Sequence, residues 1–426
     1  MPEANHRSQL KKFYNTLEDQ PIEPSNPYYY PFLQESASDP IAELANRISF
    51  SVSESVNLFT GQRGCGKSTE FRRLKQILEE DDCEVFLLDM REYMNLTTTV
   101  EISDFLISIM TALSTQIEER YHTSPAKRGY LERLADLLNA EINLDSMGIK
   151  TGLGDIKASL KDDPTFKQRL QESLQGHTAK IVKDAYIFAQ DAVELICKKN
   201  ANKHKKVVLL VDSVEQIRGV GADGSVSVHR SVENLFSGHA ASLQIPMLHI
   251  VYTIPPYLTA LAPGLGRQLG GAMACSLPSI HVQNKDNTTD ANGLAIMLEL
   301  VVKRYSYWDD FFSVEQINTL AKASGGDLRD FFRLLRAALV KTGKIVPIQD
   351  ISIEHTLNHL RREMLPIASD DKKWLREINH NKKPNLESVE KLPDLARFFD
   401  TNLVLNYRNG DDWYDVHPLL KEEIQE

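Results

Sequence analysis

Residues 56–80 read V-N-L-F-T-G-Q-R-G-C-G-K-S-T-E-F-R-R-L-K-Q-I-L-E-E and combine the three parts of one structural motif. The apolar run at 56–59 predicts a strand. The segment 61–68, G-Q-R-G-C-G-K-S, fits the pattern G-x-x-x-x-G-K-[ST] at every fixed position. Apolar residues then recur at helical spacing, namely Phe71, Leu74, Ile77 and Leu78. A strand, a glycine-rich turn and a helix in this order predict a phosphate-binding loop.

The residue types in this loop suit the binding of ATP with Mg²⁺. Glycines allow backbone N–H groups to turn around an anion, and the start of the following helix adds the positive end of its dipole. Lys67 is expected to reach the β- and γ-phosphates, and Ser68 to hold Mg²⁺. The residues expected to contact the nucleotide are Gly61, Gly64, Cys65, Gly66, Lys67, Ser68 and Thr69. The alternative is a glycine-rich turn that merely links a strand to a helix.

The composition indicates a protein of two or three domains. Its 426 residues exceed one small domain, and a hydrophobic content of 42% is enough for several cores. The net charge of -10 disfavours a surface that attracts nucleic acid as a whole, so any such site would be local. The four cysteines form no C-x-x-C pair, which favours neither a zinc site nor a disulfide framework. With no apolar signal core and no run long enough to span a membrane, a cytoplasmic protein without membrane contact is expected.

Four further apolar runs predict strands that join the strand near residue 56 in one sheet. They lie at 85–89, 207–212, 246–253 and 277–282. Five buried strands that alternate with helices predict a doubly wound parallel α/β sheet of the P-loop NTPase type. Asp212 ends the third of these strands and is the expected second partner of Mg²⁺; a solvated strand end is the alternative. Thr253 ends the next strand.

The N-terminal 40 residues are expected to form an arm with a short helix and a proline-rich irregular segment. Its cluster Tyr28-Tyr29-Tyr30 is expected to pack on its own domain, with stacking on an adenine or a base as the alternative. Asp39 and Pro40 predict the start of a helix that leads to the first strand. Residues 101–200 are interpreted as a helical insertion, with helical patterns at 101–120, near 128–140 and from about 165 to 199, and a glycine-punctuated stretch at 147–154. The basic run 197–206 is interpreted as a solvated helix end and loop, with a phosphate contact as the alternative.

From residue 291 onward, helical patterns replace strands. Three helices are predicted for a lid, at 292–305, at 314–323 with a capping box of Ser313 and Gln316, and at 327–342. Helical patterns at 351–363, 370–378 and 386–400 precede a hairpin whose turn is Asn409-Gly410. The expected domains are an arm at 1–40, a P-loop ATPase domain at 41–290, a helical lid at 291–345 and a winged-helix-like domain at 346–426.

The order of these motifs resembles that of the AAA+ and STAND-like ATPases. The phosphate loop, the acidic strand end and the polar strand end are followed by Arg267 and by Gly326-Asp327-Leu328-Arg329 in the lid. The origin-recognition branch, which ends in a winged helix, looks closest, and the chain is similar to bacterial AAA-family ATPases found among antiphage defence genes. The resemblance implies that Thr253 is sensor 1, Arg267 an arginine finger and Arg329 sensor 2. The alternatives are a simple strand end for Thr253, a surface arginine for Arg267 and an ion pair for Arg329 with an acid such as Asp330.

The chain departs from this family directly after Asp212. The family usually has an acid there, whereas this chain has Ser213, and its next acid is Glu215. A catalytic base must reach the attacking water. Glu215 is expected to do so from the loop beyond the strand, as related switch ATPases place an acid at about that offset. Slow hydrolysis, or a switch that mainly binds ATP, is therefore predicted.

Two classes of function stay open. The first is an ATP-hydrolysing switch that forms a homo-oligomer and assembles on or regulates a protein partner. The second is a DNA-binding, ATP-dependent loader or regulator that uses its winged helix as the reader. Residues 345–426 contain 11 Lys and Arg against 16 Asp and Glu, and an acidic wing would be repelled by phosphates. The protein-directed switch is therefore favoured.

Overall fold

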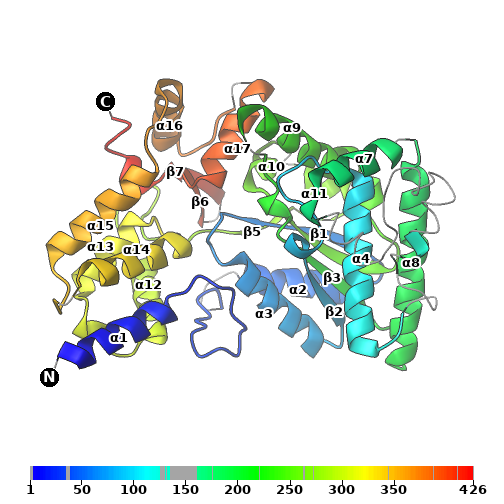
Figure 1. Cartoon of the computed structure of the whole chain (residues 1–426), viewed down its shortest axis with the longest axis horizontal. Helices are drawn as coiled ribbons and strands as arrows, with labels where there is room; N and C mark the ends of the chain where they lie inside the picture. Colours follow the sequence, from blue (N-terminus) through cyan, green and yellow to red (C-terminus); the bar gives the residue numbers. More distant parts are fainter. Residues whose placement is uncertain are drawn as a thin grey trace. The chain divides into compact units, whose positions relative to one another are not determined.

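The structure is a computed structural model that describes residues 3–34, 39–124, 130, 132–134, 161–174, 176–219, 221–261, 264–271, 273–343, 345–386, 388–409 and 411–425. The chain divides into two compact units. The first comprises residues 1–40, 61–70 and 276–426, and the second comprises residues 41–60 and 71–275. Figure 1 shows the order of the elements along the chain.

A five-stranded sheet confirms the predicted α/β class. Its strands are β1 (Ser55–Gly61), β2 (Glu84–Asp89), β3 (Val207–Asp212), β4 (Leu248–Ile254) and β5 (Cys275–Leu277), in the order β2-β3-β4-β1-β5. The pairs β2–β3, β3–β4 and β4–β1 are parallel. The carboxyl ends of β1, β4 and β3 therefore meet at one edge of the sheet, where ligands of open α/β sheets usually bind.

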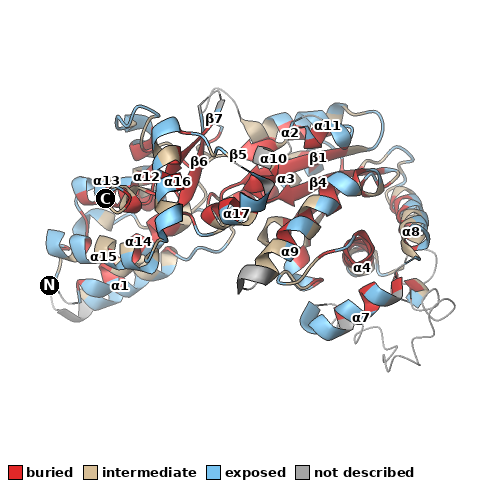
Figure 2. Ribbon diagram, turned by 90° about the horizontal axis from the view of Figure 1, so that it is seen from above, coloured by how far each residue is buried: buried red, intermediate tan, exposed pale blue. Residues whose placement is uncertain are grey.

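The central strands are apolar because both of their faces are covered. Every residue of β3 and β4 is buried, as expected for parallel strands with helices on both sides. Figure 2 shows β1 and β4 coloured as buried throughout their visible lengths. Helix α2 (Pro40–Phe50) buries the predicted apolar face, Ile41, Leu44, Ala45 and Ile48. In the part of the chain that the structure describes, no helix has the length and apolarity needed to cross a membrane.

The last strand lies earlier than the predicted 277–282. Strand β5 begins at Cys275 and ends at Leu277, directly before Pro278. The backbone then bonds to the helical unit: Ser279 donates its N–H to the carbonyl of Asn406 and Ile280 donates to that of Gly326, each at 3.2 Å. The apolar residues at 280 and 282 thus belong to the core of that unit, which explains why they mimic a strand in the sequence.

The predicted insertion contains three described helices, α4 (Ile102–Tyr121), α7 (Pro164–Leu174) and α8 (Thr178–Lys199). The helical pattern expected from about 165 to 199 is broken near Gly176, whose φ of +84° is incompatible with a continuous α-helix. The helix expected near 128–140 and the glycine-punctuated stretch at 147–154 lie outside the described residues, apart from residues 130 and 132–134.

The basic run 197–206 forms the end of α8 and a loop, as predicted, but two of its lysines bind within the protein instead of being fully solvated. Lys205 forms an ion pair with Asp82, at 2.5 Å between Nζ and Oδ1. Lys206 donates hydrogen bonds to the carbonyls of Ile48 and Ser49 at the end of α2. These contacts anchor the loop that precedes β3.

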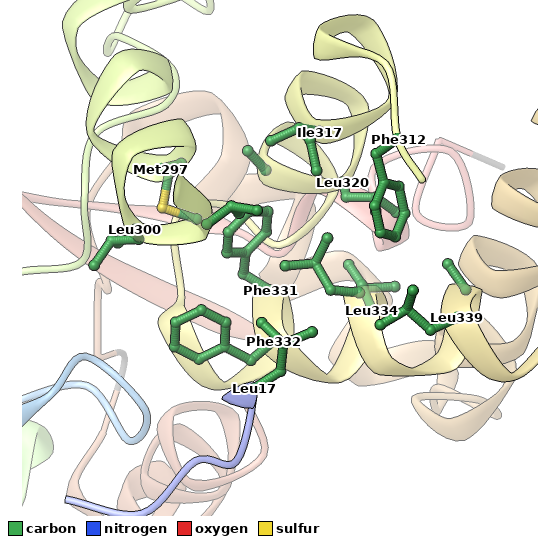
Figure 3. Packing of buried hydrophobic residues seen from close by; sticks show 14 of the residues in the cluster. Leu17, Met297, Leu300, Phe312, Ile317, Leu320, Phe331, Phe332, Leu334 and Leu339 are labelled. Carbon is green, nitrogen blue, oxygen red and sulfur yellow. The ribbon is translucent and has the colours of Figure 1, made fainter. Parts of the chain in front are cut away.

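The helices of the first unit share one apolar core with the N-terminal arm. They are α1 (Glu3–Thr16), α12 (Ala291–Arg304), α13 (Val314–Ala323), α14 (Leu328–Lys341) and α15 (Asp350–Glu363). Figure 3 shows Met297, Ile317, Leu320, Phe331 and Leu334 pointing toward one another in this core. The capping box of Ser313 and Gln316 is present as predicted. Because α15 contributes Ile353 and Leu360 to the same core, no break in packing marks residue 345, and the lid boundary stays a prediction.

The C-terminal elements are α16 (Ser369–Asn381), α17 (Leu392–Asp400) and the hairpin of β6 (Val404–Asn409) and β7 (Asp411–Val416). Helix α17 begins six residues later than the predicted start at 386, and it carries Pro393 in its first turn. The hairpin is antiparallel as predicted. Its Tyr407 and Trp413 rings stack at 4.4 Å, and the Tyr407 hydroxyl donates to the carbonyl of Gly325 at 2.7 Å. These aromatic side chains are buried, so the hairpin packs on its own unit.

The arm is expected to stabilise the first unit through Phe13, which is fully buried and stacks on Tyr305 at 4.7 Å. We predict that Phe13→Ala lowers the free energy of unfolding by about 3–5 kcal/mol, because it removes a buried ring and leaves a cavity. Urea unfolding followed by tryptophan fluorescence measures this unit alone, since Trp308, Trp374 and Trp413 all lie in it. The exposed neighbour Lys12→Ala is the control. Equal stability of the two variants would show that the arm does not support the core.

Candidate nucleotide-binding site

The phosphate loop joins β1, which ends at Gly61, to α3 (Lys67–Glu80). Gly64 and Gly66 have φ values of +98° and +100°, which glycine adopts without steric cost. The ammonium group of Lys67 donates to the carbonyls of Gly61 and Gln62, each at 3.0 Å, and the side chain is buried. The lysine therefore closes the neck of the loop and holds its positive charge beside the turned backbone.

The interior of the phosphate loop is filled by one of its own side chains, that of Cys65. The Sγ atom of Cys65 is buried and lies 3.0 Å from the position that a Cβ of Gly61 would take, so Cys65 fills the space in the loop. Ser68 and Thr69 are half-buried in the first turn of α3, where a phosphate-bound Mg²⁺ would be held. The loop thus has the turned backbone, the lysine and the hydroxyl groups that fit a nucleoside triphosphate.

The N-terminal arm reaches the start of α3. The hydroxyl of Thr69 accepts a hydrogen bond from the N–H of Ile22 at 3.3 Å, and the hydroxyl of Tyr29 donates to Glu70 at 3.1 Å. The guanidinium of Arg304 lies 5.5 Å from the centre of the Tyr28 ring. The tyrosine cluster therefore packs on its own unit, which was the favoured expectation.

The lid contacts the phosphate loop through the start of α14. A Cβ at Gly64 would lie 2.5 Å from a carboxylate oxygen of Asp327 and 2.9 Å from the Cβ of Arg329. Asp327 caps α14 by accepting the N–H of Asp330 at 2.9 Å. Arg329 forms an ion pair with Asp19 of the arm at 3.1 Å, and not with Asp330. The residue expected as sensor 2 is thus next to the loop, and its acidic partner comes from the arm.

Two acids beside the loop have raised pKa values. Burial raises the pKa of Glu70 to about 7, although the hydrogen bond from Tyr29 lowers it. Burial and the repulsion from Asp330 raise the pKa of Asp327 to about 7. Asp330 differs: burial alone would raise its pKa, but interactions with His417, Asn402 and Arg333 hold it below the usual value. Partial protonation of Glu70 and Asp327 near neutral pH lowers the negative charge where phosphates would bind.

The acidic strand end lies in the second unit. Asp212 ends β3, and one of its oxygens accepts the N–H of Ser213 at 2.7 Å. Ser213 has a φ of +70°, which is uncommon for a residue with a side chain. The chain then forms the 3-10 turn Val214–Gln216, which carries Glu215. The left-handed Ser213 thus redirects the chain so that the next acid stands on a separate turn beyond the strand.

Thr253 connects β4 to this turn. Its hydroxyl accepts the N–H of Val214 at 3.0 Å and donates to the carbonyl of Val211 at 3.3 Å. The side chain is fully buried. The residue expected as sensor 1 therefore bonds to the backbone on both sides of Asp212 and sets the position of the turn.

Asp89 and Arg91 were not identified from the sequence as site residues. Asp89 ends β2 directly beside Asp212 in the register of the sheet. The Nε atom of Arg91 lies 2.9 Å from both carboxylate oxygens of Asp89. The ion pair with Asp89, and then the charges of Asp212 and Glu215, raise the pKa of Arg91. The charged residues at the end of the predicted strand 85–89 were the signal available in the sequence. Only the register of β2 and β3 shows that Asp89 lies beside Asp212.

Arg267 lies on the short helix α11 (Leu265–Gln268) in the second unit. Its side chain is exposed and forms no ion pair with a residue in the described ranges. The role of Arg267 as an arginine finger stays a prediction.

The residues present fit a Mg²⁺ ion bound with a nucleotide better than a metal held by protein alone. Among the described residues there is no group of three or more His, Cys, Asp or Glu side chains that could hold a metal ion. Mg²⁺ at nucleotide sites takes one or two protein ligands and completes its shell with phosphate oxygens and water. In the phosphate loop, Ser68 supplies a hydroxyl of the type required, and the roles of Ser68 and Asp212 as metal ligands stay predictions.

The fold and the loop together define an α/β protein of the P-loop type. The sheet order places β4 between the phosphate-loop strand β1 and the acidic strand β3, with the predicted motifs at the carboxyl edge. A helical region follows the sheet in the chain. These features agree with the sequence resemblance to AAA+ ATPases.

Solved structures with a likeness to this chain include nucleotide-binding ATPases. The chain is similar to the ORC2 protein of Aeropyrum pernix in its ADPNP-ADP complexes, with 10% identity, 96% and 95% coverage of the two chains and a TM-score of 0.43. It is also similar to a Walker-type ATPase of Pyrococcus abyssi (11% identity, 92% and 96% coverage, TM-score 0.41) and to Cdc6p of Pyrobaculum aerophilum (10%, 95% and 97%, 0.39). No protein-family model and no curated protein sequence matches the chain. Identities and TM-scores this low assign no roles to individual residues, so the roles are argued from the geometry of the site.

We predict that Gly64→Ala lowers nucleotide affinity by tenfold or more, since its Cβ would meet the Asp327 carboxylate and its φ disfavours a side chain. Titration with a fluorescent ATP analogue measures the effect. The control is Gly224→Ala, because a Cβ at Gly224 meets nothing within 4 Å in helix α9 (Gly221–Glu233). Unchanged affinity in Gly64→Ala would show that the close approach of Asp327 to the loop is dispensable.

We predict that Asp327→Asn becomes more stable relative to the wild type as the pH rises. The pKa of Asp327 is raised above its unfolded value, so its contribution to the free energy of unfolding is fully present at acid pH and is lost as the pH rises toward 7. Asparagine keeps the helix cap and does not ionise. Urea unfolding at pH 5 and pH 8 should show a relative gain of about 1–3 kcal/mol at the higher pH. The exposed Asp309→Asn controls for the loss of a carboxylate, and a relative stability that is independent of pH would contradict the raised pKa.

Proposed function

We propose that this protein is an ATP-binding and ATP-hydrolysing switch of the AAA+/STAND-like kind that assembles on, or regulates, a protein partner. The observation that carries the proposal is the contact between Gly64 of the phosphate loop and Asp327 at the start of α14. A ligand that changes the loop changes this contact. Binding energy for nucleotide can therefore favour one position of the helical lid over another.

The proposed hydrolysis relies on charge and on an ordered water. Lys67 supplies positive charge at the β- and γ-phosphates from its place at the neck of the loop. Mg²⁺ held by Ser68 and Asp212 would neutralise charge on the phosphate oxygens. Glu215 orients the attacking water, and Thr253 acts on it indirectly by holding the N–H of Val214. Because Glu215 stands on a separate turn, we expect hydrolysis to be slow.

Arg267 and Arg329 are proposed to respond to the γ-phosphate from two sides. Arg267 is exposed and would reach the nucleotide of a neighbouring subunit, which makes a homo-oligomer part of the proposal. Arg329 would leave Asp19 of the arm for the phosphate of its own subunit. If the γ-phosphate replaces Asp19 as the partner of Arg329, the positions of the arm and the lid depend on the bound nucleotide.

A protein is the proposed partner because the C-terminal hairpin does not suit DNA. Its aromatic residues Tyr407 and Trp413 are buried, and its exposed Arg408 lies 3.8 Å from Asp412. The acidic balance of residues 345–426 would oppose a phosphate backbone. The proposed role in antiphage defence rests on the sequence resemblance.

We predict that ATP and Mg²⁺ produce larger particles of the wild-type protein, measured as molar mass by light scattering. Lys67→Ala should abolish the increase because it removes phosphate binding. Glu215→Gln should preserve or prolong it, since it blocks hydrolysis but not binding. Arg267→Ala should reduce it if the arginine acts between subunits.

The exposed Arg230→Ala, on another helix of the second unit, is the matched control for the loss of one surface arginine. A single particle mass under all conditions would exclude nucleotide-driven self-assembly. Nucleotide binding by that particle would then direct the search to a partner protein.

A further inference from the structure

The second residue of the phosphate loop, Gln62, is bound by the C-terminal part of the chain. Its side chain is fully buried. The amide nitrogen Nε2 lies 2.7 Å from the carbonyl oxygen of Phe399 and 2.9 Å from Oδ1 of Asn402. A primary amide has two N–H donors, so both donors of Gln62 are directed at residues more than 330 positions away in the chain.

Asn402 passes this contact on to the lid. It lies between α17 and β6 with a φ of +57°, a conformation that asparagine tolerates better than most residues. While its Oδ1 accepts from Gln62, its Nδ2 donates to Oδ2 of Asp330 at 3.3 Å. The two ends of one side-chain amide thus contact the phosphate loop and helix α14.

Asp330 is held as a carboxylate by further partners from the same unit. Arg333 donates to its Oδ1 at 3.2 Å, and Nε2 of His417 lies 3.7 Å from its Oδ2. Nδ1 of His417 accepts the N–H of Leu419, so the ring proton is on Nε2 and faces the carboxylate. His417 follows β7 directly, and Asn402 precedes β6. Side chains on both sides of the hairpin therefore lie at Asp330, in the first turn of α14.

These contacts return to the phosphate loop. The N–H of Asp330 is donated to Asp327, and the carboxylate of Asp327 lies against Gly64. The side chains of Gln62, Asn402, Asp330 and Asp327 are all 9% exposed or less. A change at Asn402 can therefore reach the loop by two routes, through Gln62 and through α14.

We propose that Gln62 and Asn402 form a positioning pair through which the C-terminal segment 399–417 sets the conformation of the phosphate loop. A change that loosens this segment weakens nucleotide binding, and bound nucleotide strengthens the contact of the segment with the loop by the same factor. The regulation rests on the proposed nucleotide-binding function. It adds a residue pair and a segment of this chain that act on the site without touching the nucleotide.

A double-mutant cycle on nucleotide affinity tests the pair. Gln62→Ala and Asn402→Ala should each weaken binding of a fluorescent ATP or ADP analogue by about fivefold to tenfold, since each removes hydrogen bonds that order the loop. The double variant should lose no more than the larger single loss, because both changes break one connection. Asn381→Ala, an exposed asparagine at the end of α16, is the matched control and should bind as the wild type does. Wild-type affinity in both single variants, or losses that add, would overturn the proposal.

Hydrogen exchange of the nucleotide-free protein provides a readout that does not depend on ATP. Faster exchange at residues 61–70 in Asn402→Ala, with stability of the helical core retained in urea, supports positioning, and unchanged exchange there contradicts it. Gln62→Glu keeps the size of the side chain but removes the donors, and it should reproduce the effect of Gln62→Ala. If the wild type and Lys67→Ala both fail to bind nucleotide, the proposed function fails, while the exchange measurement still decides on the positioning pair.

Discussion

The phosphate loop depends on a position that has no room for a side chain. Gly64 adopts a φ of +98°, and a Cβ on it would lie 2.5 Å from the carboxylate of Asp327. The first constraint shapes the turn that can surround an anion, and the second brings the start of α14 against that turn. One residue thus serves both the loop and its contact with the lid. Since both lie in the same compact unit, movement at the start of α14 alters the surroundings of the loop.

The charges near the loop are arranged so that few of them oppose an anion. Asp327 and Glu70 are almost fully buried, and burial raises the pKa of each to about 7. Asp330 remains ionised because Arg333, Asn402 and His417 surround it. The pKa of Asp330, the acid surrounded by these partners, is held low, whereas the two acids closest to the loop take up a proton more readily than an exposed carboxylate. This distribution lets acids cap helices and accept hydrogen bonds beside a phosphate site.

The parts of the molecule that depend on neighbouring residues in the chain could be predicted from the sequence. Strand β3 and helix α13 have the expected limits, because a continuous apolar run and a capping box are local signals. The predicted bounds of strand β5 were wrong because Ile280 and Val282 are apolar for a different reason, namely their burial in the core of the helical unit. In the candidate site, the glycine pattern identified the loop. The contact of Gln62 with Asn402 and the position of Asp89 beside Asp212 could not be found, since the first joins distant segments and the second depends on strand register.

The unusual acidic strand end has a structural consequence that links the sequence departure to the proposed slow hydrolysis. Where an acid usually follows the strand, Ser213 has a left-handed conformation, and the chain continues into the turn that carries Glu215. This turn is held by hydrogen bonds from backbone N–H groups to Asp212 and Thr253. If Glu215 is the base, as proposed, its distance from an attacking water depends on how well β3 and β4 are aligned, because the turn is bonded to both strands. The proposed switch would then have a point of control over hydrolysis that is separate from phosphate binding, which suits a long-lived ATP state.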